Sequence, residues 1–343
     1  MRPERSVFVH LGLLGAAAVL AVGVWTRDKA PKAMAQSEVT VWSGRPGDVT
    51  RIDYEGKTKK VALERKEDKQ GAYLVGTVEK SAAPPKPAAD PDAEPEEQPE
   101  APPGAPTTTT VVSVGAGQKL LDALAPLKAL RAIGKVPDDR AAEFGLGEPE
   151  GSLTVGYKSG PRKLVIGGPT PGGADRYVRD EASGEVYVLK GDVYRDLDSA
   201  EQRLVERDLH EWKEPEIAKA KISAGGKARE VVRGGSGDGK KFWADGASPG
   251  TNDETVGNWI SKLDRLRPTE YVLAAPEGQE SVVRVDYASS GNPSLGYVEL
   301  VKVPAKDGGK AEWYVTSERL RAYGKVAANN AEQVEQDIGA VVK

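Results

Sequence analysis

One glycine-rich segment of the sequence has the composition of a phosphate-binding loop. Residues 234–241 read Gly-Gly-Ser-Gly-Asp-Gly-Lys-Lys, and glycines in such loops let backbone N–H groups surround a phosphate. Lys241 stands where a hydroxyl would be needed to coordinate magnesium, and an aromatic strand follows instead of a helix. We therefore interpret the segment as a hairpin loop.

Two other glycine-rich segments also permit a ligand-binding interpretation. Gly115 and Gly117 lie between a predicted strand and a predicted helix, as in a dinucleotide-binding turn, but Leu120 takes the place of the third glycine. The cluster Gly167–Gly173 is either a ligand loop or a wide turn between two strands. We favour the plain turn in both cases.

Two pairs of acidic residues have the side chains that glycoside cleavage requires. That reaction uses two carboxyl groups about 5 to 9 Å apart, and Asp138 with Asp139, or Asp196 with Asp198, would supply them. Both pairs precede predicted helices, where aspartate accepts hydrogen bonds from free backbone N–H groups. We therefore expect these residues to cap helices.

Four tryptophans allow a further binding hypothesis. A set of coplanar, exposed indole rings would stack on sugar rings, whereas aromatic side chains on half-buried strands and helices usually belong to the core. We expect core positions for Trp212, Trp243, Trp259 and Trp313.

The composition excludes several classes of site. The chain has no cysteine, which excludes disulfides, thiolate nucleophiles and zinc sites built on sulfur. Its two histidines, His10 and His210, are too few for a multi-histidine metal site, and His10 lies in an apolar run. The net charge is −4, from 48 basic and 52 acidic residues, and gives no electrostatic signature of nucleic-acid binding. We expect no catalytic residue, no metal and no cofactor.

An uncharged apolar run, Val7–Trp25, follows two arginines at the start of the chain. As a helix the run would be about 28 Å long, enough to cross the hydrocarbon core of a bilayer. A cleaved secretory signal is the alternative, because Ala33-Met34-Ala35 fits a cleavage site, but that site lies far beyond the apolar run. We predict an uncleaved transmembrane anchor.

Two features of the predicted anchor leave its surroundings open. Gly12 and Ala16 are small residues four positions apart, which would let two membrane helices approach closely, although ordinary use of small residues in a membrane helix is the interpretation we favour. Basic residues are similarly frequent on both sides of the run, so charge does not determine the orientation.

The remaining sequence divides into segments of different composition. Residues 80–106 are rich in proline, alanine and acid, which predicts an extended, solvated insertion, with a polyproline ligand as the alternative role. The predicted organisation is a cytoplasmic tail (1–5), the anchor (6–26), a linker (27–46), a first unit (47–135) interrupted by the insertion, a central strand-rich unit (136–212), a second copy of the first unit (213–275) and a carboxy-terminal unit (276–343).

A repeated pattern of hairpin, aromatic strand and helix links the first unit to its second copy. Hairpins are predicted at 49–65 and 217–233, each followed by an aromatic strand. Apolar residues at helical spacing then predict one amphipathic helix per copy, through Leu120, Leu124, Leu127 and Leu130 in the first and Val256, Ile260, Leu263 and Leu266 in the second.

Local signals refine the helix boundaries. Thr251 and Glu254 predict a capping box at the start of the second helix, and Pro126 should kink the first helix or begin a new segment. Further helices are predicted at 199–207, 317–323 and 331–341. The fold class that follows is α+β, with antiparallel sheets and helices packed on one side.

A series of motifs in the central unit resembles a known family. The series is Glu143-Phe144-Gly145-Leu146 with Pro149, then Leu164-Val165-Ile166-Gly167, Asp175-Arg176-Tyr177-Val178-Arg179 and Glu185-Val186-Tyr187-Val188. It is similar to the domain of unknown function 4340, and the resemblance extends from about residue 47 to about residue 326. Members look like bacterial envelope proteins, typically encoded beside an ABC-type transporter permease and a protein similar to a gliding-motility auxiliary component. The family carries no established catalytic residues.

The resemblance implies a single-pass protein of the bacterial inner membrane with its soluble part in the periplasm. We expect a non-enzymatic accessory or scaffold subunit of an ABC-type transporter or gliding-related complex, which acts by binding protein partners. A glycan-binding module and a cell-wall-acting hydrolase are the alternatives from other functional classes. An enzyme would gather reactive side chains in one pocket, whereas a glycan binder would expose coplanar tryptophans.

Overall fold

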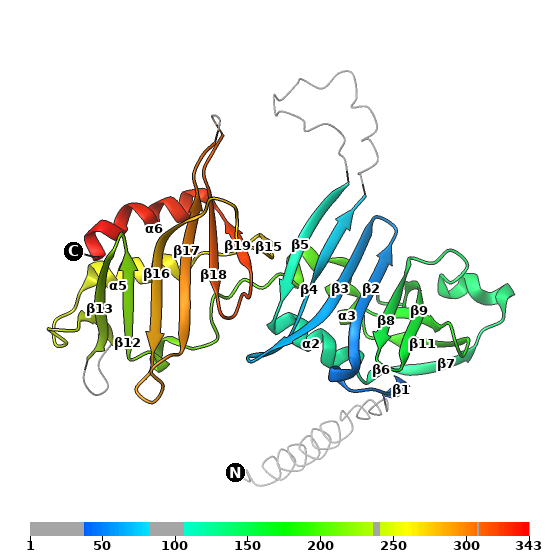
Figure 1. The fold of residues 1–343 in the computed structure, drawn as a ribbon. Helices are drawn as coiled ribbons and strands as arrows, with labels where there is room; N and C mark the ends of the chain where they lie inside the picture. The colour runs from blue at the N-terminus through cyan, green and yellow to red at the C-terminus, as the bar shows by residue number, and fades with distance from the viewer. Residues whose placement is uncertain (1–37, 82–105, 236–240, 307–308, 343) are drawn as a thin grey trace, which may run out of the picture.

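Two antiparallel sheets with helices packed against them dominate the computed structural model, which describes residues 38–81, 106–235, 241–306 and 309–342 (Figure 1). The α+β class expected from the sequence is therefore confirmed. The predicted tail (1–5), the predicted anchor (6–26) with Gly12 and Ala16, and most of the proline-rich insertion lie outside the described residues. Within the described ranges, no helix has both the length and the apolar character needed to cross a membrane.

The first sheet has nine strands and forms what we call the N-lobe, together with a small two-stranded sheet and the helices α2 to α4. Its strands follow the order β5-β4-β3-β2-β8-β9-β10-β11-β7. The bounds are β2 Val49–Gly56, β3 Lys59–Asp68, β4 Gly71–Lys80, β5 Thr107–Ser113, β7 Arg131–Lys135, β8 Gly151–Tyr157, β9 Gly160–Pro169, β10 Arg176–Asp180 and β11 Glu185–Leu189, with β1 Val39–Trp42 and β6 Leu127–Ala129 in the small sheet, and η1 Pro46–Asp48, α2 Gly115–Leu124, η2 Asp138–Phe144, α3 Gly191–Asp198 and α4 Ala200–Arg203 around them.

The second sheet has eight strands and forms the C-lobe with the helices α5 and α6, which pack against each other. Its strands follow the order β14-β13-β12-β16-β17-β18-β19-β15. The bounds are η3 Glu214–Glu216, β12 Lys219–Ala224, β13 Lys227–Gly234, β14 Phe242–Asp245, α5 Glu254–Leu263, β15 Glu270–Val272, β16 Glu280–Ala288, β17 Gly296–Val303, β18 Glu312–Ser317, β19 Tyr323–Val326 and α6 Ala328–Val341.

The two sheets share one strand order. From one edge of the sheet to the other, the strands β4-β3-β2-β8-β9-β10-β11-β7 of the N-lobe correspond one by one to the eight strands of the C-lobe. The strand β5 is an additional edge strand of the N-lobe. In each lobe the first strand of the first hairpin pairs with a strand that follows the helix in the chain, β2 with β8 and β12 with β16. Strands from 47–135 and 136–212 therefore lie in one sheet, and strands from 213–275 and 276–343 in the other.

Alternation of apolar and polar residues explains why these segments form strands with one buried face. In β8, for example, Leu153, Val155 and Tyr157 are buried, whereas the residues between them are partly exposed. Both predicted hairpins are confirmed by the pairing of β2 with β3 and of β12 with β13. Gly225 and Gly226 form the turn of the second hairpin with φ of 55° and 78°, a conformation that glycine adopts without steric cost.

The first amphipathic helix is shorter than predicted. The α2 helix ends at Leu124, and Leu127 lies in β6, which pairs with β1. The prediction that Pro126 begins a new segment is confirmed, since proline lacks the N–H that would continue the helix. The continuation of the helix through Leu130 was wrong, because the chain beyond Pro126 forms a short strand in which Leu127 and Ala129 are the buried alternate residues.

The second amphipathic helix is present, but its predicted cap is wrong. The α5 helix begins at Glu254, and its N-cap is Asp253, whose carboxylate accepts a hydrogen bond from the backbone N–H of Val256 at 3.0 Å. Thr251 lies two residues before this cap. Aspartate and threonine are both good N-cap residues. The prediction favoured Thr251 because Glu254 follows it at the spacing of a capping box.

Of the three further helices, one is confirmed and two are wrong. Residues 331–341 lie within α6, as expected. The segment predicted as helix 199–207 contains only the short α4, and a longer helix, α3, precedes it. The segment 317–323 joins β18 to β19 through a turn. Polar residues predominate in α3, so apolar periodicity gave too weak a signal for it.

Candidate functional site

The glycine-rich segment 234–241 joins two strands. Gly234 is the last residue of β13 and pairs with Phe242, the first residue of β14. Residues 236–240 lie outside the described residues. The interpretation as a hairpin loop is therefore confirmed by the strands on either side of it.

The start of α2, where a dinucleotide-binding turn was considered, already holds an acidic side chain. The backbone N–H of Gly115, the first residue of α2, donates to Oε2 of Glu206 at 3.0 Å. A helix N-terminus attracts anions through its free N–H groups and its dipole. Because the carboxylate of Glu206 fills this position, the turn serves the fold, as favoured from the sequence.

The cluster Gly167–Gly173 covers the last residues of β9 and the turn that leads to β10, and its first glycines explain why the Phe-Gly-Leu motif contains a glycine. Gly145 ends η2 with a φ of 66°, and a Cβ there would lie 2.3 Å from the backbone nitrogen of Gly168. Only glycine permits this approach. The Phe-Gly-Leu motif and the two glycines near the end of β9, Gly167 and Gly168, therefore hold η2 against the sheet.

The two acidic pairs are separate structural features. Asp138 and Asp139 begin η2, whose N-cap is Pro137, without a side-chain capping bond. Asp196 pairs with Arg203 at 2.6 Å, and Asp198 accepts a hydrogen bond from the Tyr54 hydroxyl at 2.9 Å. The prediction that these residues cap helices is wrong, because Asp196 and Asp198 lie in the second half of α3.

Most of the tryptophans considered for sugar stacking lie in the core. Trp243, Trp259 and Trp313 are all at most 5% exposed, which confirms the expectation. Trp212 is partly buried and stacks on His210 with ring centroids 4.6 Å apart. The indole rings of the three buried residues are therefore closed to a ligand at the surface.

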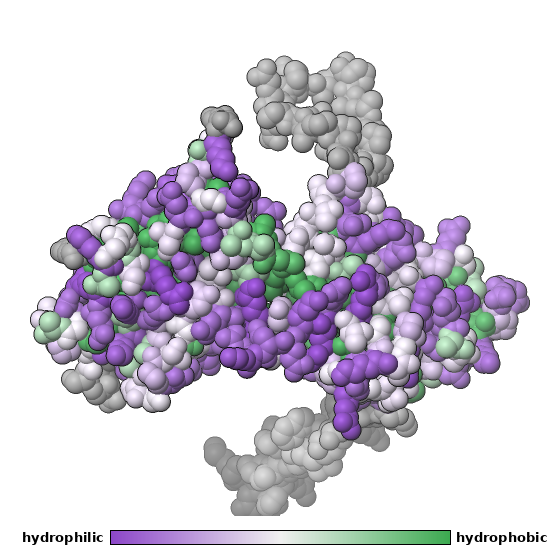
Figure 2. Space-filling view, viewed as in Figure 1, coloured by the Kyte–Doolittle hydropathy of each residue, from purple (hydrophilic) through white to green (hydrophobic). Residues whose placement is uncertain are grey.

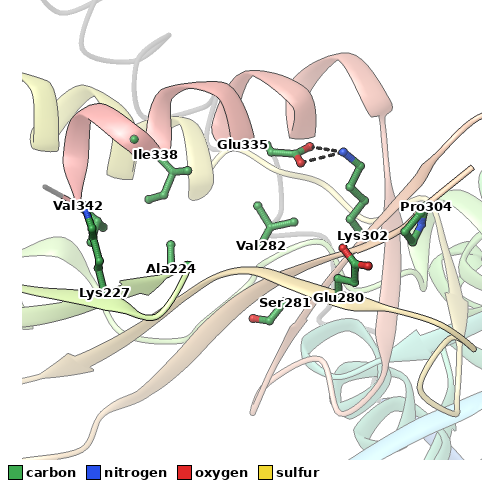
Figure 3. Close-up of a pocket in the computed structure, with 12 residues that line it drawn as sticks. Ala224, Lys227, Glu280, Ser281, Val282, Lys302, Pro304, Glu335, Ile338 and Val342 are labelled. Carbon is green, nitrogen blue, oxygen red and sulfur yellow. Dashed lines mark hydrogen bonds and ion pairs between the residues drawn. The ribbon is translucent and has the colours of Figure 1, made fainter.

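A hollow in the described surface runs beneath α6 in the C-lobe and has a volume of about 630 Å³ (Figure 3). Its floor is apolar, since Ala224, Val282 and Ile338 pack against the core while remaining partly exposed. Charged side chains, Lys227 and Glu280 among them, stand around the floor. Volumes of this size are typical of small-molecule pockets, so the groove can receive an amphipathic group.

An ion pair attaches α6 to the sheet within this groove. Lys302 of β17 donates to both carboxylate oxygens of Glu335 at 2.8 and 3.0 Å, as the dashed lines in Figure 3 mark. The indole N–H of Trp313 donates to the same carboxylate at 3.0 Å. Since Glu335 is satisfied by these three bonds, the pair fixes the helix and offers no free base for catalysis.

A second cluster joins the two lobes, and we call it the junction. Its centre is Glu206, whose side chain is 6% exposed. Oε2 accepts from Gly115 of the N-lobe and, at 3.0 Å, from the guanidinium of Arg319 of the C-lobe, while the N–H groups of Arg207 and Asp208 donate to Oε1. One buried carboxylate therefore binds groups from both lobes and from the segment between them.

The backbone of Glu206 strengthens this connection. Its N–H donates to the carbonyl of Val112 in β5 at 2.7 Å, and its carbonyl accepts from the hydroxyl of Tyr271 in β15 at 2.6 Å. Burial raises the pKa of Tyr271 well above its usual value, so the hydroxyl remains a donor at all physiological pH values. The edge strands β5 and β15 of the two sheets lie against each other at this point.

Arg321 makes a second bridge between the lobes. Its guanidinium binds both carboxylate oxygens of Asp68, with NH2 to Oδ1 at 3.1 Å, and lies 4.8 Å from the ring centroid of Tyr73. Arg321 has a φ of 57°, which is unusual for a residue with a side chain. Such strain persists only where neighbouring contacts enforce it, which indicates a tightly fixed turn.

These junction residues were not foreseen from the sequence. Nothing in the local pattern around Glu206, Arg319 or Arg321 separates them from the many other charged residues, because each binds a partner in the other lobe or at its edge that is more than 90 positions away in the chain. In the ranges that the structure describes, histidines and acids form no group of three or more that could hold a metal ion.

The family comparison agrees with the motif series. Residues 116–286 match the model of the domain of unknown function 4340 (DUF4340). The match begins in α2, ends in β16 and includes the junction residue Glu206. No curated protein and no solved structure matches the chain.

Proposed function

Given that residues 116–286 belong to the family of the domain of unknown function 4340, we propose that the chain is a membrane-anchored, non-enzymatic accessory subunit of an ABC-type transporter or gliding-related complex. In this proposal Val7–Trp25 holds the chain in the bacterial inner membrane, and the two lobes lie in the periplasm. The lobes act by binding protein partners. The transporter association comes from the family resemblance.

The observation that carries the proposal is the junction. Two lobes of equal strand order are connected through Glu206, which bonds to both, and through the bidentate pair of Arg321 and Asp68. A buried carboxylate that accepts hydrogen bonds from both lobes resists their separation, because breaking its ion pair with Arg319 leaves a desolvated charge. The lobes therefore hold their surfaces at a fixed spacing, as a subunit that positions its partners requires.

The chemistry of the groove supports the same role. Its floor of Ala224, Val282 and Ile338 offers an apolar contact, and the unlike charges of Lys227 and Glu280 would orient an amphipathic segment laid across it. Apolar centres with polar rims are common in protein–protein interfaces.

Cross-linking in intact cells, followed by purification of the full chain and identification of what it carries, tests the proposal. We expect a transporter permease to be recovered. A Glu206→Ala chain should recover less of it, since the lobes lose their fixed relation, and a Glu211→Ala chain provides the matched control because Glu211 is exposed and contacts the same Arg319.

Two results would contradict the proposal. One is recovery of no protein partner, combined with hydrolysis of cell-wall polymers by the purified chain. The other is equal recovery from the Glu206→Ala and wild-type chains, which would show that the fixed junction has no part in partner binding.

A further inference from the structure

The outer edge of β5 carries backbone groups with no partner in the described part of the chain. The carbonyl of Val112 points away from β4, because it accepts the N–H of Glu206. The β4–β5 pairing is regular from Thr107 to Ser113, and in an antiparallel strand alternate residues direct both N–H and C=O to the same side. Thr108 and Thr110 therefore direct these groups outward, where the structure records no backbone hydrogen bond for them.

This edge lacks the devices that normally protect one. Exposed edge strands usually carry lysine, proline or a bulge that prevents pairing with another chain. The first four residues of β5, Thr107–Thr110, are instead uncharged threonines. A β-branched residue at each of these positions favours the extended conformation. By contrast, β7 at the opposite edge of the sheet contains Arg131, Lys135 and a register shift.

An apolar surface lies next to the unprotected edge. Two of the three exposed large hydrophobic side chains in the described residues are Val272, at the end of β15, and Leu273, which is 59% exposed. The strand β15 packs against β5. Figure 2 shows an apolar area in the indentation between the lobes. The backbone edge and the apolar area thus belong to one concave surface, which we call the notch.

We propose that the notch binds an extended, uncharged segment of a protein partner as an additional strand on β5. Backbone groups of the segment would pair with Thr108 and Thr110, and an apolar side chain would cover Leu273. An uncharged segment fits because Thr107–Thr110 carry no charge and the exposed side chains of Val272 and Leu273 are apolar. The partner segment is limited to one short strand because Glu206 already binds the carbonyl of Val112 and β15 already contacts β5. The inference rests on the proposed function and names the chemistry of its partner.

Binding of a fluorescein-labelled nonapeptide of alternating threonine and valine to the full chain tests the proposal, since strand addition depends mainly on backbone bonds. Thr110→Pro removes an outward N–H without disturbing the bonds to β4, as edge strands tolerate proline in that orientation. We expect this variant to weaken binding about three- to tenfold, the worth of one backbone hydrogen bond. Thr110→Val, which keeps the N–H, should bind like the wild type.

A second probe leaves the protein unchanged. The same peptide with N-methyl groups on alternate residues loses the donors of one edge, so one of its two methylation patterns should bind at least tenfold more weakly. Hydrogen exchange resolved to single amides should show Thr108 and Thr110 unprotected in the free chain and protected with saturating peptide.

Several outcomes would overturn the proposal. These are the absence of binding to the wild-type chain at millimolar peptide, equal affinities of the Thr110→Pro and Thr110→Val chains, and protection of Thr108 and Thr110 without peptide. If that protection depends on protein concentration, a second copy of the chain pairs with the edge of β5. If it does not, another part of the same chain pairs with it. Failure here leaves recovery of a permease from cells unaffected, so the two proposals are tested separately.

Discussion

Replacement of Glu206 by alanine is the perturbation that should affect the molecule most. The carboxylate accepts hydrogen bonds from Gly115, Arg207, Asp208 and Arg319, and it is 6% exposed. Alanine removes all four at once. The guanidinium of Arg319, 13% exposed, then retains only Glu211 as its carboxylate partner.

The magnitude follows from burial. Removing one partner of a buried ion pair typically costs about 3–5 kcal/mol, because the other charge stays desolvated without compensation. Glu211 pairs with the same arginine but is 69% exposed, and exposed pairs contribute about 0–1 kcal/mol. With a urea dependence of about 3 kcal/mol per M, Glu206→Ala should lower the unfolding midpoint by about 1–1.7 M, and Glu211→Ala by at most about 0.3 M.

Equilibrium urea unfolding of the full chain, followed by tryptophan fluorescence, measures both variants. Hydrogen exchange at Gly115 provides a local readout, since its amide loses its acceptor only in Glu206→Ala. If both variants shift the midpoint equally, or if Glu206→Ala costs less than about 1 kcal/mol, then the junction is not the tight connection between the lobes that its contacts indicate.

Two other predictions concern α5 and the N-lobe. Asp253→Ala should cost about 1–2 kcal/mol through loss of the helix cap, whereas Thr251→Ala should cost less than about 0.5 kcal/mol, and urea unfolding distinguishes them; the reverse ranking would restore the cap predicted from the sequence. Burial raises the pKa of the Glu201 carboxyl, but hydrogen bonds from Lys80 and Lys59 outweigh it and hold that pKa below its usual value. The carboxylate therefore stabilises the fold above the unfolded-state pKa of about 4.3, and this contribution is lost as the pH falls through the folded-state value. Glu201→Gln should be less stable than the wild type at pH 7, with a smaller difference at pH 3.5, and a difference that does not change with pH would refute this assignment.

The sequence predicted the features that arise from neighbouring residues. Hairpins such as 217–233 could be located because alternation and paired glycines act over a few positions. Helix ends were less certain, since Pro126 correctly marked a break while the leucine spacing beyond it continued the helical period, although Leu127 lies in β6. The α3 helix was missed because it is only eight residues long and its apolar stripe consists of little more than Val193 and Leu197, too short a pattern to predict a helix.

The junction and the notch depend on contacts between distant residues. Glu206 has no local feature that distinguishes it from a surface acid, and its role arises only when β5, α2 and the C-lobe meet around it. Thr107–Thr110 could be recognised as a strand, but its position at an edge follows from the complete strand order. The alternation of apolar and polar residues identifies a strand, but it does not show which strands lie beside it in the sheet.

The central claim, that the chain stays attached to the membrane by its first residues, has one direct measurement. Membranes from cells that produce the full chain are washed with alkaline carbonate, and the amino-terminal peptide of the retained protein is identified by mass spectrometry. We expect the chain in the washed membranes with Val7–Trp25 still present. A mature chain that begins after Ala35 and leaves the membrane in the wash would contradict the account.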